Sequence, residues 1–496
     1  MRRGEILEGV VQRTDYPARG IVEAEGRLFE VKGTLEGQKV RFRVNRKSAA
    51  RSEGTLLEIL ERAEAEQSPD CPHFPACGGC SYRTLSEEAQ ISMKREQIRR
   101  LFASDLEPEM KGTEGKAEDM PGDAQDLKPV YEGILSSPAY DGYRNKMEFT
   151  FGDAEKGGEI QLGMHERGSF FNIVTVDQCR IVDGDVQKIL REVLLFARES
   201  GLPCYHRTGH IGIFRHLLIR KAFRTGEILL DLVTSGQGEG LRENSAARPD
   251  EEYRENTEKE TGELNFQDLI DRLLKLDLEG EITGILHTVN DHVADAIIND
   301  RTDLLYGRDY IVEKLLDLSF KITPFSFFQT NTMGAEVLYE TVRRFVGDTK
   351  GKVIFDLYSG TGTIAQILAP LAEHVTGVEI IPEAVEAARE NAKRNGLSNC
   401  EFLCGDVLKV VGELQRKPDI IVLDPPREGV NPKALPKILA FQVPRIVYIS
   451  CKATSLKRDL ISFRLAGYRL LRLQAVDLFP GTPHVETVVL LSKAER

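Results

Sequence analysis

Three cysteines near residue 75 lie close enough together in the sequence to bind one metal ion or cluster. Cys71, Cys77 and Cys80 have the spacing C-x5-C-x2-C, and Gly78 and Gly79 precede the third. Thiols at this spacing are typical of metal ligands, and adjacent glycines leave backbone amides open to a bound group. The run predicts an iron–sulfur cluster or a tetrahedral zinc site, each of which needs a fourth ligand. Unpaired core thiols are the alternative.

A glycine turn follows an apolar run near residue 360. The segment 353–363, VIFDLYSGTGT, predicts a strand that runs into a turn and then a helix. Gly360 and Gly362 would let a ligand approach the main chain closely. Glu379 lies nineteen residues after Gly360, at the end of the next expected strand, where a carboxylate can accept both hydroxyls of a ribose. The third glycine of the dinucleotide fingerprint is missing, so the match is partial.

Other polar side chains follow the remaining apolar runs of this region. Asp406 comes after the third expected strand, Asp424 after the fourth and Cys451 after the fifth. Two prolines follow Asp424 directly and would hold its carboxylate in a rigid turn. In an open α/β sheet the ligand lies outside the carboxyl ends of the strands, so these residues should converge on one crevice. That convergence favours S-adenosylmethionine over a redox dinucleotide.

The elements that would position these side chains alternate strand and helix over the final 150 residues. Strands are expected at 353–357, 374–378, 419–423 and 445–450. A helix is expected from Pro382 to about Asn395, because proline suits a first helical turn and Gly396 follows the last. The alternation predicts a doubly wound α/β sheet.

The first 60 residues follow another pattern, with short alternating runs separated by Gly, Pro and Asn. This pattern predicts a small β-barrel. The first 51 residues carry twelve Lys/Arg against seven Asp/Glu. Lys39, Arg41 and Arg43 alternate with apolar residues, which would place three cations on one face. Such a face is either solvated or follows a nucleic-acid backbone.

The chain has 496 residues, enough for two to four domains, and a formal net charge of -12. Residues 104–127 and 236–264 supply eleven of the twelve excess negative charges and are predicted to be solvated insertions. No run approaches the ~18 apolar residues of a membrane-spanning helix, and the charged start predicts no secretory signal. We therefore expect a cytoplasmic protein whose eight cysteines are thiols, ligands or nucleophiles.

Five motifs resemble those of the bacterial RNA uridine-5-methyltransferase family. The motifs are Gln329-Thr330-Asn331, Asp356 to Gly362, Asp424-Pro425-Pro426-Arg427, Ser450-Cys451 with Arg458-Asp459-Leu460, and the segment 479–486. The likeness spans nearly the whole chain and is greatest to the ribosomal-RNA branch, which has a TRAM barrel and a four-iron cluster. It implies an OB-type, RNA-binding TRAM barrel at 1–62, a central α+β domain at 63–330 with the iron–sulfur site, and a class I (Rossmann-like) methyltransferase domain at 331–496.

The resemblance also implies a covalent mechanism. Carbon 5 of uracil is a weak nucleophile, so a thiolate, here Cys451, must first add to carbon 6. After methyl transfer a base, here Glu486, must remove the proton of carbon 5. The family fold implies an antiparallel last strand, which would bring Glu486 to the edge that carries Cys451. The family usually continues its cysteine with Asn-Pro, whereas Lys452 and Ala453 follow here.

Binding residues follow from the same resemblance. Gln329, Tyr358, Glu379 and Asp424 would contact S-adenosylmethionine. Asp406 and Gly360 would complete that site through their places at the strand ends. An extruded uracil would stack on Phe327 and Phe328.

Cys179 matches the family's distant fourth cluster ligand. With Cys71, Cys77 and Cys80 it implies a [4Fe-4S] cluster, and zinc stays the alternative. The spacing differs from the C-x3-C-x2-C of radical S-adenosylmethionine enzymes. The remaining cysteines without an expected role are structural in this interpretation: Cys204, Cys400 and Cys404.

The expected activity is S-adenosylmethionine-dependent methylation of carbon 5 of a uridine in RNA, by a monomer that binds no membrane. The expected substrate is 23S ribosomal RNA. The alternatives are transfer RNA, a cytosine-5 or amine methyltransferase, and a non-catalytic RNA-binding protein on the same scaffold. Amine methylation typically uses Asn-Pro-Pro-Tyr, and the motif at Asp424 ends in Arg427 instead of that aromatic residue.

Overall fold

The computed structural model describes residues 3–46, 52–106, 129–155, 157–238, 264–293, 297, 300–410, 412 and 416–493. The chain forms two compact units. The first comprises Met1–Pro69, Ser81–Pro138 and Met333–Arg496, and the second comprises Asp70–Cys80 and Ala139–Thr332. Most of the acidic segments 104–127 and 236–264, predicted to be solvated insertions, lies outside the described residues.

A closed five-stranded barrel begins the first unit, as the alternating pattern predicts. Its strands are β1 (Ile6–Asp15), β2 (Arg19–Ala24), β3 (Arg27–Lys32), β4 (Lys39–Arg46) and β5 (Ser52–Glu61). They close in the order β1-β2-β3-β5-β4, and β3 runs parallel to β5. Val22, Val31, Val40 and Phe42 fill its interior without exposure to solvent.

The cationic face expected on β4 is largely neutralised by neighbouring strands. Lys39 Nζ lies 3.2 Å from the Glu61 carboxylate on β5. Arg41 pairs with Glu8 on β1 at 2.8 Å and with Glu58 on β5 at 2.6 Å. The pattern of one strand carries no information about the glutamates opposite it. Two of the three expected cations are therefore paired within the barrel.

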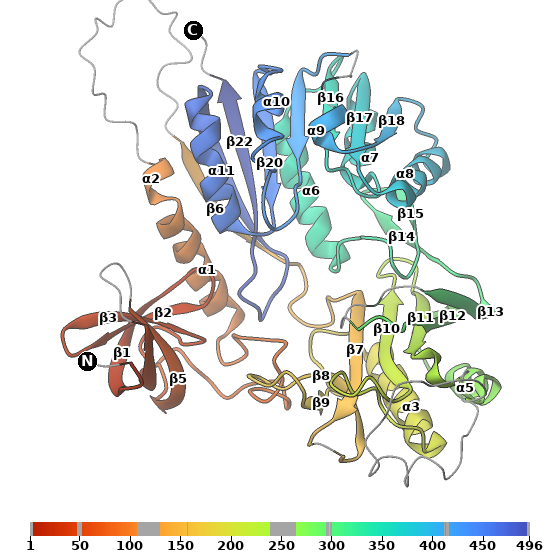
Figure 1. The fold of residues 1–496 in the computed structure, drawn as a ribbon. Coiled ribbons are helices and arrows are strands. Elements are labelled where there is room, and N and C mark those ends of the chain that lie inside the picture. Colours follow the sequence, from red (N-terminus) through yellow and green to blue (C-terminus); the bar gives the residue numbers. More distant parts are fainter. Residues whose placement is uncertain are drawn as a thin grey trace, which may run out of the picture. The chain divides into compact units, whose positions relative to one another are not determined.

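An eight-stranded sheet forms the rest of the first unit, in the order β18-β17-β16-β19-β20-β22-β21-β6 (Figure 1). Its strands are β6 (Val130–Ser136), β16 (Val353–Leu357), β17 (His374–Glu379), β18 (Cys400–Cys404), β19 (Ile420–Leu423), β20 (Arg445–Ser450), β21 (Tyr468–Asp477) and β22 (Glu486–Lys493). The pairs from β18 to β20 are parallel. β22 runs antiparallel to both of its neighbours, so the predicted antiparallel last strand is present. The doubly wound fold is confirmed.

Helices connect and cover these strands (Figure 1). They are α1 (Glu87–Leu101), α2 (Ala103–Leu106), α6 (Thr332–Val346), α7 (Thr363–Leu368), η2 (Ala369–Leu371), α8 (Pro382–Arg394), α9 (Val407–Val410), α10 (Leu435–Leu439) and α11 (Ala453–Leu465). Proline at the first turn begins α8, and Gly396 takes a φ of 66° just beyond its end. Central strands such as β19 and β20 are nearly continuous buried apolar runs, because helices cover both of their faces.

Helix α1 belongs to the first unit, although the sequence analysis assigned residues 63–330 to a central domain. Ser86 caps it by accepting a hydrogen bond from the Ala89 amide at 3.2 Å. Ile98 and Phe102, at its end, are fully buried in the same core cluster as Leu456 of α11. Apolar contacts with a sheet that is distant in sequence therefore place this helix, and its local sequence carries no sign of them.

The second unit contains a seven-stranded sheet in the order β13-β12-β11-β10-β7-β8-β9. Its strands are β7 (Lys146–Asp153), β8 (Ile160–His165), β9 (Ile173–Thr175), β10 (Phe214–Lys221), β11 (Glu227–Thr234), β12 (Glu281–Val289) and β13 (Arg301–Gly307). A separate hairpin joins β14 (Ile311–Leu315) to β15 (Leu318–Ile322). Among the described residues of this unit, the helices are α3 (Gly184–Ser200), η1 (Gly236–Gly238) and α5 (Phe266–Leu273). The predicted α+β composition is present here.

Among the described residues, no helix is both long enough and apolar enough to cross a bilayer.

Candidate active site

The glycine turn after β16 is held in place by two carboxylates. Asp356 is fully buried in β16, and its Oδ2 accepts a hydrogen bond from the Ala365 amide of α7 at 2.9 Å. Burial, together with the charges of Asp424 and Glu379, raises the pKa of Asp356 to about 8. Glu379 Oε2 accepts from the Gly360 amide at 3.0 Å. The predicted ribose-binding carboxylate thus lies directly against the turn.

The turn itself needs left-handed backbone at three positions. Tyr358, Gly360 and Gly362 have φ values of 71°, 52° and 74°. A Cβ on Gly362 would lie 2.6 Å from the ring of Phe402, so a larger residue does not fit there. Burial raises the pKa of Tyr358 to about 12, and its hydroxyl therefore stays protonated at neutral pH. These residues form a compact loop at the carboxyl end of β16.

Two further predicted binding residues end the neighbouring strands. Asp406 follows β18, and its Oδ1 accepts from the Leu408 amide at 2.9 Å at the start of α9. Asp424 follows β19, on the other side of β16. Burial raises the pKa of Asp424 to about 7. The predicted convergence on one sheet edge therefore holds for Gly360, Glu379, Asp406 and Asp424 by topology.

Strand register brings the two predicted catalytic residues together. Ser450 of β20 is paired with Thr487 of β22. Because the two strands are antiparallel, Cys451 and Glu486 occupy the next position at the same end of this pair. The Thr487 hydroxyl donates to the Ser450 carbonyl at 3.2 Å and closes this end of the strand pair. Thirty-five residues of chain separate the thiol and the carboxylate, yet they occupy adjacent strand ends.

The electrostatics of this pair follow from its burial. Burial, then the charge of Asp424, raises the pKa of Glu486 to about 8, although Arg427 opposes the shift. Burial, then the charges of Glu486 and Asp424, raises the pKa of Cys451 to about 11. A carboxyl group with a pKa near neutrality is suited to accept a proton during a reaction. A buried thiol beside acidic groups instead needs help to ionise.

The residues of the Gln329 motif lie in the second unit. The side chain of Asn145 donates to the Gln329 carbonyl at 3.0 Å. Phe327 is 65% exposed, whereas Phe328 is 4% exposed and packs on Phe320 with 5.8 Å between ring centroids. The expectation that both rings stack on a base is therefore wrong for Phe328, which is part of the core. A pair of adjacent aromatic residues does not tell which of them faces outward.

The four cysteines of the predicted cluster share one neighbourhood of the second unit. Burial raises the pKa of Cys179 to about 12, and the charges of Cys80, Cys77 and Cys71 add to the shift. All four are free thiols, and the Gly79 amide donates to Cys77 Sγ at 3.4 Å. In the part of the chain that the structure describes, no three Cys, His, Asp or Glu side chains adopt a metal-binding geometry. Four thiols are the donor type that an iron–sulfur cluster or zinc takes, so the predicted metal site rests on the cysteine spacing in the sequence and not on this geometry.

Comparisons with known proteins identify the family of this chain. A family model described as tRNA (Uracil-5-)-methyltransferase matches residues 296–494. An uncharacterized RNA methyltransferase from Clostridium tetani is 43% identical over 495 residues, which cover 100% of this chain and 99% of the relative. One from Caldanaerobacter subterraneus is 42% identical, with complete coverage of both chains. The chain belongs to the RNA uracil-5-methyltransferase family.

A solved structure has the same fold as this methyltransferase. The crystal structure of Pyrococcus abyssi tRNA (uracil-54, C5)-methyltransferase in complex with S-adenosyl-L-homocysteine matches with a TM-score of 0.70. The match covers 98% of this chain and 99% of that one, at 23% sequence identity. At this identity the likeness shows the fold.

Sequence reasoning missed the contacts that hold the loops of this candidate active site. Asp459 lies in the recognised Arg458-Asp459-Leu460 motif, and its Oδ2 accepts from the Val430 amide at 2.9 Å and from the Tyr448 hydroxyl at 2.8 Å. The Ser455 hydroxyl donates to the Arg427 carbonyl at 2.7 Å. Helix α11 therefore anchors the loop that follows Asp424.

Helix α1 and the residues before it hold the loop that leads to Glu486. The Gly481 amide donates to Gln90 Oε1 at 2.9 Å, and the Ser81 amide donates to the Gly481 carbonyl at 2.8 Å. Lys94 Nζ lies 2.7 Å from Asp477, and both side chains are almost completely buried. The segment 479–486 was recognised as a family motif. No residue pattern in α1 indicated that this helix contacts the segment.

Proposed function

We propose that this enzyme methylates carbon 5 of a uridine in 23S ribosomal RNA, with S-adenosylmethionine as methyl donor and a covalent adduct at Cys451. The placement of Glu486 beside Cys451 by the register of β20 and β22 carries the proposal. Family membership supports RNA uracil-5 methylation, and the ribosomal substrate rests on the resemblance of the barrel and cysteine run to the ribosomal branch.

The proposed reaction begins at Cys451. Its thiol gives its proton to water, and the thiolate adds to carbon 6 of uracil, so that the π-electron pair of the carbon 5–carbon 6 bond moves into an enolate. S-Adenosylmethionine, when bound, supplies an electrophilic methyl group to carbon 5. Glu486 then accepts the proton of carbon 5, the double bond re-forms, and the sulfur leaves carbon 6 with its electron pair.

The pKa values fit this division of labour. Glu486, with a pKa near 8, is a base of useful strength near neutral pH. Burial raises the pKa of Cys451 to about 11, so its thiol is protonated at neutral pH. Arg427, which opposes both upward shifts, is the cation that would favour thiolate as it forms.

The test replaces each member of the pair. Cys451→Ala should abolish methylation and adduct formation. Glu486→Gln should allow addition and methyl transfer and then stall, so that labelled RNA stays bonded to the protein on a denaturing gel. The double variant should give no shifted band. If Glu486→Gln releases methylated RNA at the wild-type rate, Glu486 is not the base, and His484 or an ordered water takes its place.

Transfer RNA is the second candidate substrate, because the matching family model and the Pyrococcus abyssi structure both name it. The substrate is identified by mapping 5-methyluridine in ribosomal and transfer RNA from cells with and without the gene. Loss of the modification from transfer RNA alone would replace the ribosomal assignment. A protein that binds RNA but transfers no methyl group to either would support the non-catalytic alternative.

We further propose that Tyr358, Gly360, Glu379, Asp406 and Asp424 bind S-adenosylmethionine, together with Gln329. The turn at Gly360 and the carboxylate of Glu379 are already in contact, which supports a ribose site there. Glu379→Ala should weaken binding of S-adenosylhomocysteine, measured by calorimetry without RNA. Unchanged affinity would exclude Glu379 from the site.

We propose that Cys71, Cys77, Cys80 and Cys179 hold a [4Fe-4S] cluster. When bound, such a cluster would link residues 71–80 to the segment around Cys179 through iron–thiolate bonds within the second unit. Protein purified without oxygen should be brown and contain about four irons per chain. Cys179→Ser should reduce that iron content, whereas Cys404→Ser should not. A colourless protein with one zinc ion would support the alternative.

A further inference from the structure

Arg220 is a charged side chain that is buried in the second unit. It lies near the end of β10 and is 2% exposed, and burial lowers the pKa of its guanidinium to about 10, so the group stays charged at neutral pH. A buried charge costs free energy unless hydrogen bonds or an opposite charge compensate it. Nε of Arg220 donates to the Pro324 carbonyl at 3.0 Å, and Nη2 donates to the Ser326 carbonyl.

The two carbonyls belong to a short turn that follows β15. Pro324 and Ser326 are two residues apart, and one planar guanidinium can hold both carbonyls in a fixed geometry. The Ser326 hydroxyl donates to the Thr323 carbonyl and accepts from the Thr323 amide, both at 3.0 Å, which closes the turn. The turn 323–326 is therefore held by its own serine and by Arg220 of β10.

Phe327 is the exposed residue between two anchored points of the chain. On one side, Arg220 holds the carbonyl of Ser326. On the other side, Phe328 is 4% exposed and belongs to the core, whereas Phe327 is 65% exposed. Because both neighbours are held, the backbone of Phe327 is restricted and its ring projects from a fixed base.

We propose that Arg220 is a positioning residue that fixes the turn 323–326 and thereby the direction in which the Phe327 ring projects. The inference rests on the proposed uracil methylation, in which Phe327 is the ring expected to stack on an extruded base. Stacking depends on the angle and offset between two rings, so a misdirected ring loses the contact. Arg220 is buried, so it acts through Phe327 and not on RNA directly.

The first test follows the side chain at position 327 and needs no RNA. The chain contains no tryptophan, so Phe327→Trp introduces a single indole fluorophore. Time-resolved fluorescence anisotropy then measures the motion of this indole on the nanosecond scale. Arg220→Lys keeps a positive charge but lacks the planar group that holds two carbonyls at once. It should increase the amplitude of the fast anisotropy decay about twofold, because the turn loosens.

Arg215→Lys is the matched control. Arg215 lies on the same strand and is also 2% exposed. It also donates to two backbone carbonyls, those of Asn290 at 2.6 Å and His292 at 2.8 Å. Both lysine variants should lower the melting temperature. Only Arg220→Lys should alter the anisotropy of an indole at position 327, because Arg215 holds a different loop.

The second test is a double-mutant cycle on methyl transfer. If Arg220 acts through the Phe327 ring, its substitution matters only while that ring is present. Arg220→Lys should lower kcat/KM for RNA about tenfold in the wild-type background and less than about twofold with Phe327→Ala. Any penalty of Arg215→Lys should be the same in both backgrounds.

Binding of S-adenosylhomocysteine separates Phe327 from the nearby Gln329. The Asn145 side chain donates to the Gln329 carbonyl at 3.0 Å and to the Thr332 hydroxyl at 2.9 Å, so Gln329 has a support of its own. Arg220→Lys should therefore leave the dissociation constant of S-adenosylhomocysteine within about twofold of the wild-type value. A loss of this affinity as large as the loss of kcat/KM would overturn the inference, because Arg220 would then act on the proposed cofactor site.

Ser326→Ala is a second variant that decides the question if Arg220→Lys does not fold. It removes the hydroxyl that closes the turn and leaves Arg220 in place. The amplitude of the fast anisotropy decay should again increase, by less than in Arg220→Lys.

Unchanged anisotropy in Arg220→Lys, or in Ser326→Ala when Arg220→Lys is unfolded, would overturn the inference. Equal kcat/KM penalties of Arg220→Lys with and without the Phe327 ring would do the same. If the anisotropy responds as expected while no variant, wild type included, transfers a methyl group, the proposed function fails and the positioning of residue 327 by Arg220 stands.

Discussion

The two halves of the eight-stranded sheet hold their functional side chains by different means. At the β16–β17 half, Asp356 is bonded to an amide nine residues away and Glu379 to one nineteen residues away. At the β20–β22 half, Gln90 reaches Gly481 across 391 residues, and Lys94 reaches Asp477 across 383. The proposed binding turn is a local structure, whereas the strand ends that carry the proposed catalytic residues depend on the amino-terminal part of the chain.

This difference suggests a division between binding and reaction. A turn held by its own neighbours should keep its shape whatever happens in the barrel or in α1. The loop before Glu486 and the turn after Cys451 should respond to changes there. Damage to α1 is therefore expected to reduce catalysis before it reduces binding of S-adenosylhomocysteine.

The largest expected effect tests the long-range half. Lys94→Met leaves the Asp477 carboxylate buried without its cation, which should cost about 3–5 kcal/mol in the free energy of unfolding. Burial lowers the pKa of Lys94 and raises that of Asp477, so each charge already depends on the other. Urea unfolding of the first unit measures this loss of stability. Binding of S-adenosylhomocysteine is measured on the same variant.

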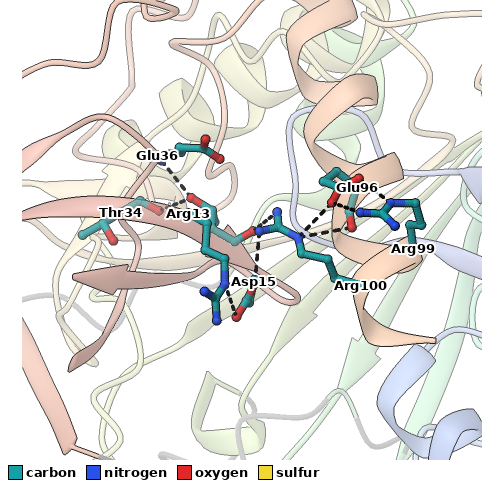
Figure 2. Close-up of polar contacts among 8 residues, drawn as sticks. Arg13, Asp15, Thr34, Glu36, Glu96, Arg99 and Arg100 are labelled. Carbon is teal, nitrogen blue, oxygen red and sulfur yellow. Dashed lines mark hydrogen bonds and ion pairs between the residues drawn. The ribbon is translucent and has the colours of Figure 1, made fainter. Parts of the chain in front are cut away.

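Arg99→Met, on the same helix, is the control for this change. Arg99 pairs with Glu96 at 2.7 Å (Figure 2), but the two side chains are 58% and 43% exposed. Loss of such a solvent-screened surface pair should leave the free energy of unfolding nearly unchanged. If Lys94→Met costs as little as Arg99→Met, the catalytic half does not depend on α1 as the structure indicates.

The sequence was most informative where structure is local. The glycine turn, the carboxylates at the strand ends and the short strands of the barrel follow from local sequence patterns, and the structure has all of them. Cys451 and Glu486 were paired only through a family resemblance that implied the antiparallel β22. The contacts of Gln90 and Lys94 join segments hundreds of residues apart, and no residue type or spacing predicts them.

Burial decided the details that the sequence left open. Adjacent Phe327 and Phe328 have the same residue type, and only the fold shows that one is exposed and the other is core. The sequence predicts Arg41 as an exposed cation on β4. Pairing of β4 with β1 and β5 places Glu8 and Glu58 opposite it. Both depend on tertiary neighbours, which override local pattern.

A smaller effect tests the local half by comparing two glycines of one turn. Gly362→Ala places a methyl group 2.6 Å from Phe402 at a φ of 74°, and should cost about 2–4 kcal/mol. Gly360→Ala meets nothing within 4 Å and carries only the cost of a φ of 52°, about 1 kcal/mol. Both changes should weaken S-adenosylhomocysteine binding while leaving alkylation of Cys451 unchanged. Altered Cys451 reactivity in Gly362→Ala would show that the two halves are coupled.

The smallest expected effect is a pH dependence in the local half. Burial raises the pKa of Asp356 from 3.8 to about 8, so the folded protein holds this proton more tightly than the unfolded chain does. Stability from the neutral form is fully present below the unfolded pKa and is lost as pH rises towards 8. Asp356→Asn cannot ionise, and its side-chain oxygen can still accept from the Ala365 amide. Between about pH 5 and about pH 9 the wild type should therefore lose roughly 1 kcal/mol or more relative to the variant. Glu486 has a raised pKa in both proteins, so its contribution cancels in the difference between the two urea-unfolding series. The charge of Asp424 acts on Asp356, so that difference measures the titration of this coupled pair. Parallel pH profiles would mean that Asp356 stays ionised and that the turn, with its single amide donor, stabilises the carboxylate more than burial opposes it.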